Sequence, residues 1–313
     1  MLGIYYWVPS VLGLPKEIIK GIQEITKNDL EKMKDVRVPA IRLVGDSPDF
    51  LFETAHQAKK MGFKVWIGPG FNRKIPMPDK KGYLKTIKDF AIQAKKVNAD
   101  VFVIGNELSI ELSDFAGNQI YQDHIEDWKT FQRQLRGKEK EFRNYLILLA
   151  KEVKERFPGP ITYAAAGPLI YDGERWGGRW ELDNIEWDIF DVVAANFYWS
   201  KCIPKNRYIF TLRKLKMLGK PVAVTEFGFQ TIREAFDFGG SSSRKQKYPW
   251  HYSEDTQAKL LKRNIELLQQ SGIEYAFLHQ WREFDNSGFG IIKGDGKSKK
   301  AFKVISRYFS KFS

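Results

Sequence analysis

The stretch Val101-Phe-Val-Ile-Gly-Asn-Glu107 decides the fold of this chain, together with the similar stretch Pro221-Val-Ala-Val-Thr-Glu226. Each is a short apolar run rich in β-branched residues, which is the pattern of a strand buried on both faces of a parallel sheet. Each run ends in a glutamate. Because a charged carboxylate is costly to desolvate, we expect both glutamates at exposed strand tips, where ionisable groups often have a function.

Outward from these two runs, strand-like segments alternate with amphipathic helix-like segments along the chain. Eight strands are expected, at residues 3–8, 40–44, 64–67, 100–105, 161–166, 191–196, 221–225 and 274–280. Eight such units in 313 residues predict a (β/α)8 TIM barrel. The alternative is an open doubly wound sheet, which would need a glycine-rich turn after its first strand. The segment Trp7-Val-Pro-Ser10 is not such a turn.

Long loops are expected after the fourth, fifth and seventh strands, at residues 108–136, 167–187 and 227–252. In a barrel these loops and both glutamates lie on the carboxyl-terminal face, where active sites occur. The sequence shows no linker rich in Pro and Ser and no short repeat, so residues 1–313 are expected to form a single catalytic domain. Asn28 is expected to cap the amino terminus of the first long helix.

The net charge is +13, from 51 basic and 38 acidic residues, and the lysines are dispersed along helix-like segments. This indicates a solvated surface, and abundant Lys and Glu with scarce Cys is also typical of thermophilic proteins. No zinc-finger, RRM-type or basic-zipper pattern is present, so no nucleic-acid partner is expected. Cys202 is the only cysteine and the four histidines form no HExxH pair, so neither a metal nor another cofactor is expected.

The sequence lacks an apolar run of the roughly 18 residues that a membrane span needs. Its first residues, Met1 to Pro9, carry no basic segment of the kind that opens a signal peptide. The expected location is therefore the cytoplasm, with secretion left open in case a signal has been removed. Nothing in the sequence indicates the oligomeric state.

Two carboxylates facing one cleft are the minimum apparatus for hydrolysing a glycosidic bond. One protonates the departing oxygen and the other attacks the anomeric carbon, and in retaining enzymes they lie about 5–5.5 Å apart. Three barrel units separate Glu107 from Glu226 in the sequence, so their side chains can converge across the barrel mouth.

Asn106-Glu107 after a fourth strand, Glu226 after a seventh and Trp281 after an eighth resemble clan A of the glycoside hydrolases, the 4/7 superfamily. This superfamily includes family 5 cellulases and mannanases and family 113 mannanases, and the resemblance covers residues 4 to about 292. It implies a retaining glycoside hydrolase that cleaves β-linked glycans, such as β-mannan, β-glucan or related oligosaccharides, by double displacement. By the same resemblance, Glu107 is the acid/base and Glu226 the nucleophile.

The resemblance also assigns substrate-binding roles. Asn106 matches the asparagine that bonds the sugar 2-hydroxyl, and Arg42 matches the arginine that keeps the nucleophile ionised. Tyr198 matches the tyrosine that orients the nucleophile, while Asn196 stands where the clan often has histidine. Trp281 matches the aromatic floor under the sugar.

Three further residues are candidates from their position alone. Trp7 and Trp66 offer apolar faces that suit the C–H face of a sugar, although large aromatic residues often only pack. His279 lies two residues before Trp281, on the same face of a strand, so we expect it deeper beneath the site.

Other functions stay open at this stage. The same residues would serve an exo-β-glycosidase or a transglycosylase on small oligosaccharides. A non-catalytic carbohydrate-binding barrel would be marked by loss of a catalytic carboxylate, and both are present. A phosphate-handling barrel would need a glycine-rich turn after strands seven and eight, and residues 284–290 are instead aromatic and acidic.

Overall fold

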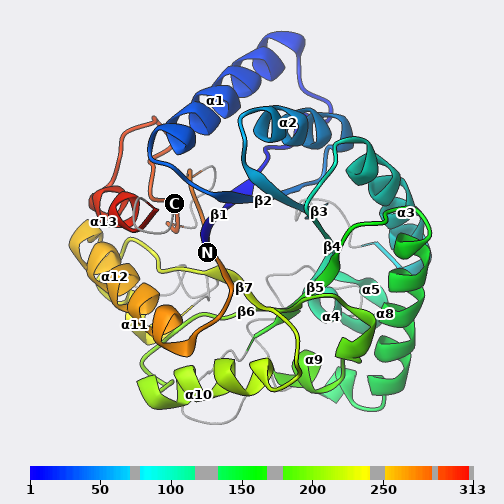
Figure 1. The fold of residues 1–313 in the computed structure, drawn as a ribbon. Helices are drawn as coiled ribbons and strands as arrows, with labels where there is room; N and C mark the ends of the chain where they lie inside the picture. Colours follow the sequence, from blue (N-terminus) through cyan, green and yellow to red (C-terminus); the bar gives the residue numbers. More distant parts are fainter. Residues whose placement is uncertain (71–77, 117–132, 168–178, 240–250, 284–287, 310–313) are drawn as a thin grey trace.

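The computed structural model describes residues 1–70, 78–116, 133–167, 179–239, 251–283 and 288–309. Eight parallel strands pair in sequence order, and the last pairs with the first to close a barrel, as Figure 1 shows. The predicted (β/α)8 barrel is therefore confirmed. The strands are β1 Leu2–Trp7, β2 Ala40–Gly45, β3 Lys64–Pro69, β4 Val101–Asn106, β5 Ile161–Ala166, β6 Val193–Asn196, β7 Val222–Phe227 and β8 Tyr275–Leu278.

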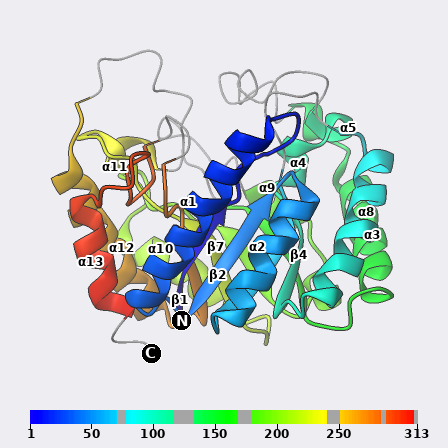
Figure 2. The same cartoon turned by 90° about the horizontal axis from the view of Figure 1, so that it is seen from above.

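Helices surround the barrel (Figure 1). The long ones are α1 Lys16–Asp35, α2 Pro48–Lys60, α3 Lys80–Lys96, α8 Glu139–Lys154, α10 Lys205–Lys216, α12 Glu254–Ser271 and α13 Lys300–Phe309. The short ones are α4 Leu108–Glu111, α5 Ser113–Ala116, α9 Arg179–Asp183, the 3-10 turn Trp187–Ile189 and α11 Ala235–Phe238. In Figure 2 the amino terminus lies at the lower end of the barrel, whereas α4, α5 and α11, which follow β4 and β7, lie at the upper end. The upper end is therefore the carboxyl-terminal face.

The period-two pattern of the strands separates two apolar cores. Alternate strand residues pack against the helices in the larger core, for example Val222 and Val224 of β7. The residues between them fill the barrel interior, which is lined by Tyr5, Ala40, Val44, Trp66, Val101, Val103, Ala164, Val192, Ala194, Ala223 and Phe277. Because the interior is filled with side chains, only the mouth of the barrel is left for chemistry.

Local signals set most helix ends. Asp79 accepts a hydrogen bond from the Gly82 N–H at the start of α3, and Ser253 does the same for Thr256 at the start of α12. The expected N-cap at Asn28 is corrected, because α1 begins at Lys16 after Pro15 and Asn28 lies inside it. Pro15 supplies a fixed φ and needs no N–H at a helix start, which explains the earlier beginning.

Strand β7 carries one extra residue relative to both neighbouring strands. Its Val224 and Glu226 pair with Ala195 and Asn196, which are consecutive in β6. The added residue is Thr225, and it reverses the alternation of side chains beyond it. Val224 faces the helices, and the bulge brings Glu226 to the level of Asn196 at the mouth of the barrel.

Strand β4 has a comparable irregularity. Val103 pairs with Thr162 and Asn106 with Ala164, so β4 uses three residue steps where β5 uses two. Gly105 lies within the shift, and an added Cβ there would stand 2.7 Å from the side chain of Leu108. The bulge turns Asn106 toward the barrel mouth, where strict alternation would turn it outward.

The three long loops were expected at residues 108–136, 167–187 and 227–252, and segments 117–132, 168–178 and 240–250 of them lie outside the described residues. The described parts follow β4, β5 and β7, as predicted. In the portion of the chain that the structure describes, no helix is long and apolar enough to cross a membrane.

Candidate active site

Glu226 lies at the tip of β7 and is bound from both sides. Arg42 of β2, which is 0% exposed, donates from one guanidinium nitrogen to Glu226 Oε1 at 3.0 Å and to the Thr225 carbonyl at 2.9 Å. The hydroxyl of Tyr198 donates to Glu226 Oε2 at 2.8 Å. Burial and the charge of Glu226 raise the pKa of Tyr198 well above its usual range, so Tyr198 stays protonated as a donor.

A chain of hydrogen bonds joins this pair to Glu107. The second terminal nitrogen of Arg42 donates to Asn106 Oδ1 at 2.7 Å. The Asn196 amide donates both to Asn106 Oδ1 at 3.1 Å and to Glu107 Oε1 at 2.9 Å. The Thr225 hydroxyl in turn donates to Asn196 Oδ1 at 2.9 Å, which fixes the orientation of that amide. Glu107 and Glu226 therefore belong to one network at the barrel mouth.

Glu107 has an environment of the opposite kind. Burial, followed by the charge of Glu226, raises the pKa of Glu107 from 4.5 to about 8, and the hydrogen bond from Asn196 opposes this only in part. Glu181 and Glu111 add smaller raising effects. Near neutral pH, Glu107 therefore carries a proton that it can donate, whereas Glu226 has a guanidinium beside it that favours its charge.

The backbone of Glu107 is left-handed, with φ 49° and ψ 45°. For a residue with a side chain this conformation costs about 1–2 kcal/mol. Such strain persists where the surroundings hold it, and it is concentrated at functional sites. The turn ends β4, starts α4 at Leu108 and leaves the Glu107 carboxyl directed at Asn196.

An aromatic wall stands beside Glu226. The guanidinium carbon of Arg42 lies 5.0 Å from the ring centre of Tyr5. The half-buried ring of His279 contacts Tyr5 at 4.7 Å, Phe289 at 5.1 Å and Tyr198 at 6.3 Å between ring centres. We refer to Tyr5, Tyr198, His279 and Phe289 as the aromatic wall.

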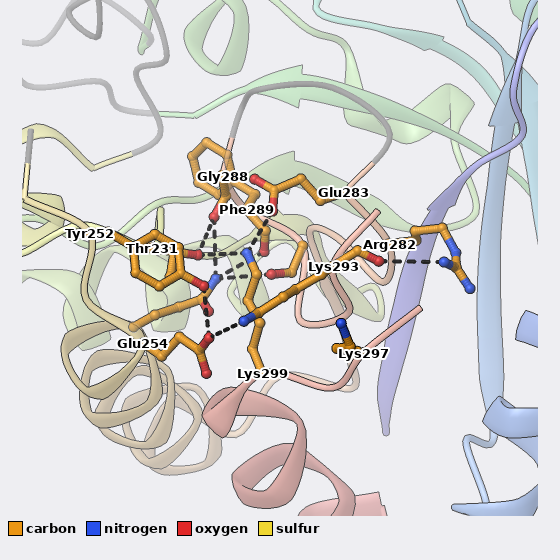
Figure 3. Close-up of polar contacts among 12 residues, drawn as sticks. Thr231, Tyr252, Glu254, Arg282, Glu283, Gly288, Phe289, Lys293, Lys297 and Lys299 are labelled. Atoms are coloured by element: carbon orange, nitrogen blue, oxygen red, sulfur yellow. Dashed lines mark hydrogen bonds and ion pairs between the residues drawn. The ribbon is translucent and has the colours of Figure 1, made fainter. Parts of the chain in front are cut away.

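Buried polar contacts anchor the segment that carries Phe289, as Figure 3 shows. The amine of Lys299 donates to the Thr231 hydroxyl at 2.8 Å and forms an ion pair with Glu283 at 2.8 Å. The Thr231 backbone N–H and hydroxyl both donate to the Gly288 carbonyl. These contacts tie the segments after β7 and β8 to the start of α13, and they hold the segment that carries Phe289 in place.

The structure corrects the expectation for Trp281. Its side chain is 0% exposed and packs against Phe302 of α13, with ring centres 5.7 Å apart. It therefore presents no face to a sugar. The reason is that the chain leaves β8 at Leu278, so period-two alternation does not extend from His279 to Trp281. His279, which was expected to lie deeper, occupies the mouth instead.

The two other tryptophan candidates differ from each other. Trp66 is corrected as well, because it is buried in the barrel interior against Tyr275 and Phe277 and cannot reach a substrate. Trp7 is half-buried at the end of β1 and packs over Gly70, where an added Cβ would lie 2.7 Å from its ring. Trp7 remains a candidate at the rim.

The structure brings together six of the residues named from the sequence: Arg42, Asn106, Glu107, Asn196, Tyr198 and Glu226. It also adds residues that the sequence analysis did not name. Tyr5 was accessible to the same reasoning, since it shares an inward face with Trp7 at period two. Thr225 adjoins Glu226 and could have been noted as polar. Phe289 and Glu181 had no sequence signal, because each reaches the site from a loop or a short helix. Among the described residues no cluster of three or more His, Cys, Asp or Glu could hold a metal ion.

Comparison with known proteins gives structural matches only. No protein-family model matches the chain, and no curated protein matches it significantly. The GH113 β-mannanase AaManA from Alicyclobacillus acidocaldarius, in complex with ManMIm, superposes with a TM-score of 0.65 at 15% identity over 99% of this chain and 97% of that one.

Two further solved structures are similar. A GH113 β-1,4-mannanase gives a TM-score of 0.61 at 19% identity, over 92% of this chain and 93% of that one. A GH5_18 protein from Streptomyces cattleya, in complex with Manβ1-4GlcNAc, gives 0.70 at 11% identity, over 99% and 80%. At these identities the likeness establishes the fold, which is the TIM barrel of the GH113 and GH5 proteins. The fold-level resemblance expected from the sequence is thus confirmed.

Proposed function

We propose that this protein is a retaining glycoside hydrolase that cleaves β-linked glycans, with Glu107 as acid/base and Glu226 as nucleophile. The observation that carries the proposal is the division of two neighbouring carboxyl groups into opposite environments. Glu226 is paired with the Arg42 guanidinium, and Glu107 is held among neutral and acidic groups. A glycosidase of this class needs one protonated and one ionised carboxyl group at the same site.

In the first step, the Glu226 carboxylate attacks the anomeric carbon while Glu107 gives its proton to the departing glycosidic oxygen. A glycosyl ester on Glu226 results. Glu107, now ionised, takes a proton from water, and the oxygen of that water displaces Glu226 from the sugar. Both carboxyl groups end in their starting states.

The asparagine and tyrosine contacts suit this sequence. Asn106 uses its oxygen to accept from Arg42 and Asn196, so its amide nitrogen is the group left to donate to a sugar hydroxyl. Tyr198 donates to one oxygen of Glu226 and Arg42 to the other, which fixes the plane of the carboxylate. The aromatic wall supplies apolar surface for a sugar ring.

We further propose β-mannosidic linkages as the first substrates to test, in an oligo- or polysaccharide. The support is that two of the similar structures are named as β-mannanases and a third was solved with Manβ1-4GlcNAc. β-Glucan and small β-glycosides belong in the same panel, since exo action and transglycosylation would use the same residues.

The test compares wild type with Glu226→Ala and Glu107→Ala on activated aryl β-glycosides in the presence of azide. For Glu226→Ala, azide replaces the missing nucleophile and should give the glycosyl azide of inverted configuration. For Glu107→Ala, azide attacks the glycosyl ester and should give the retained configuration. Opposite anomers from the two variants would assign both roles in one experiment.

Glu155→Ala is a matched control, because Glu155 is an exposed glutamate in the helix layer. It should keep wild-type rates. If no β-glycoside in the panel is cleaved, or if both variants keep full activity, the proposal is overturned, and calorimetry with oligosaccharides would then test a binding-only barrel.

A further inference from the structure

Glu181 is a buried carboxyl group that the proposed chemistry does not use directly. It lies on α9, is 1% exposed, and accepts hydrogen bonds at both oxygens. Its Oε1 accepts from the Ser109 N–H at 2.8 Å and from the Tyr163 hydroxyl at 2.9 Å. Its Oε2 accepts from the Ala166 N–H at 2.5 Å. All three donors are uncharged, so desolvation of this carboxyl group is offset by hydrogen bonds without a cation.

These bonds meet at the turn that presents Glu107. The N–H of Leu108, the residue after Glu107, donates to the Tyr163 hydroxyl at 2.6 Å, and the next N–H, that of Ser109, donates to Glu181. The first N–H groups of a helix have no partner within the helix. Glu181 and Tyr163 therefore satisfy the two that follow the left-handed residue, and they link the end of β4 to the end of β5.

Support of this kind is what a left-handed glutamate requires. The φ of 49° at Glu107 is disfavoured for a residue with a side chain, and it is kept where neighbouring groups hold the backbone on both sides. Before the turn, the Glu107 N–H pairs with the Ala164 carbonyl at 2.9 Å. After the turn, Tyr163 and Glu181 are the groups that hold it.

Glu181 also faces Glu107 electrostatically. The charged groups that act on Glu107 come from three elements: Glu226 on β7, Glu181 on α9 and Glu111 on α4. Each of them raises the pKa of Glu107, and the Asn196 amide opposes them. Burial raises the pKa of Glu181 as well, while its hydrogen-bond donors lower it. A negative charge at Glu181 therefore helps Glu107 to keep its proton.

We propose that Glu181, acting with Tyr163, is a positioning residue for the acid/base group, because it fixes the left-handed turn that aims the Glu107 carboxyl and places a second carboxylate behind it. The role rests on the function proposed above. Glu181 touches no substrate in this scheme and acts only through Glu107.

The test is Glu181→Gln, assayed for kcat/KM on two substrates of the same sugar. One is an aryl glycoside whose leaving group needs no proton, and the other is an unactivated oligosaccharide. General acid catalysis contributes only where the leaving group is poor. We expect a loss of about tenfold or more in kcat/KM on the oligosaccharide, and little change on the activated glycoside.

The pH profile provides the second readout. The alkaline limb of kcat/KM on the oligosaccharide follows ionisation of Glu107, because only its protonated form donates. Removing a negative charge lowers the pKa of Glu107, so the limb should move to lower pH in Glu181→Gln. Glu181→Asp keeps the carboxyl group but moves it back by one methylene, so the alkaline limb should stay near its wild-type position. This variant also gives a result if the glutamine variant folds poorly.

Glu186→Gln is the matched control, since Glu186 is an exposed glutamate five residues further along. It should change neither readout. An equal loss on both substrates with an unmoved alkaline limb would reduce Glu181 to a structural role and overturn the proposal. A wild type that cleaves neither substrate would overturn the proposed function and this role with it. A carbon-13 NMR titration of the Glu107 carboxyl, which needs no turnover, should still show a lower midpoint in Glu181→Gln if the electrostatic part is right.

Discussion

Glu107 and Glu226, the two carboxyl groups of the candidate site, lie at the ends of similar strands but in opposite electrostatic environments. Both follow an apolar strand with one extra residue, on β4 and on β7. Around Glu226 the neighbours are a buried cation and a phenol that donates to it. Around Glu107 they are an amide and further carboxyl groups. The comparison indicates that the strand determines where each carboxyl group lies, whereas residues from other barrel units determine whether that carboxyl group is protonated.

The largest effect is expected from removing the cation with Arg42→Met. This leaves Glu226 without its ion-pair partner in a site where it is 8% exposed. We expect the free energy of unfolding to fall by about 3–5 kcal/mol, because a buried charge loses its partner. We also expect kcat/KM to fall by about 100-fold or more, because an oriented charge at the reacting group is lost.

Urea denaturation and steady-state kinetics measure the two effects. The control is the double variant Arg42→Met/Glu226→Gln, in which no charge is left unpaired. It should regain much of the stability and none of the activity. If Arg42→Met unfolds like wild type, the contrast between the two environments is not electrostatic.

The next prediction distinguishes Trp281 from His279, the two residues near β8 that are candidates for the aromatic surface beneath the sugar. Trp281→Leu removes part of a buried ring and should lower the free energy of unfolding by about 2–4 kcal/mol, with kcat/KM nearly unchanged. His279→Ala removes a half-buried ring of the aromatic wall, so it should lower kcat/KM with a smaller cost in stability. Thermal denaturation and kinetics on one oligosaccharide distinguish the two variants. If Trp281→Leu lowered kcat/KM and His279→Ala did not, Trp281 would again be the residue expected beneath the sugar.

A smaller effect is expected on stability from Glu107→Gln. The folded protein raises the pKa of Glu107 from 4.5 to about 8, so the native state holds a proton that the unfolded chain releases. The stability gained from this proton is complete below pH 4.5 and is lost as pH rises through 8. Glutamine cannot ionise, and its oxygen can still accept from Asn196.

The glutamine variant should therefore match wild type near pH 4 and exceed it by about 1 kcal/mol or more at pH 8. Melting temperatures across this range provide the measurement. Glu226→Gln should instead lower the stability, because it removes the ion-pair partner of Arg42. Parallel curves for the two variants would mean that the two carboxyl groups share one environment.

Much of this arrangement could be predicted from the sequence. The apolar runs that end at Asn106 and Glu226 located both strand tips. That prediction depends only on local pattern and on the geometry of a closed parallel barrel. The fold was accessible for the same reason. Arg42, Asn196 and Tyr198 were named through the resemblance to clan A.

What the sequence could not supply depends on register between strands and on loops. The period-two rule misplaced Trp281, because the strand ends at Leu278. It also overestimated Trp66, because an inward residue low in a barrel is packed by its neighbours and does not reach the mouth. No sequence pattern indicated the role of Glu181, because that role depends on hydrogen bonds from the N–H groups of Ser109 and Ala166, which are more than ten residues away in the sequence.

The extra residue at Thr225 has a consequence for how this chain can change. If β7 kept all its residues but paired with β6 without this bulge, strict alternation would return, and Glu226 would turn into the layer of helices, as Val224 does. A slip of one position in this pairing would thus abolish the chemistry without removing any reactive group. A homologue that retained every named side chain could still be inactive, because the face on which Glu226 lies depends on one bulge.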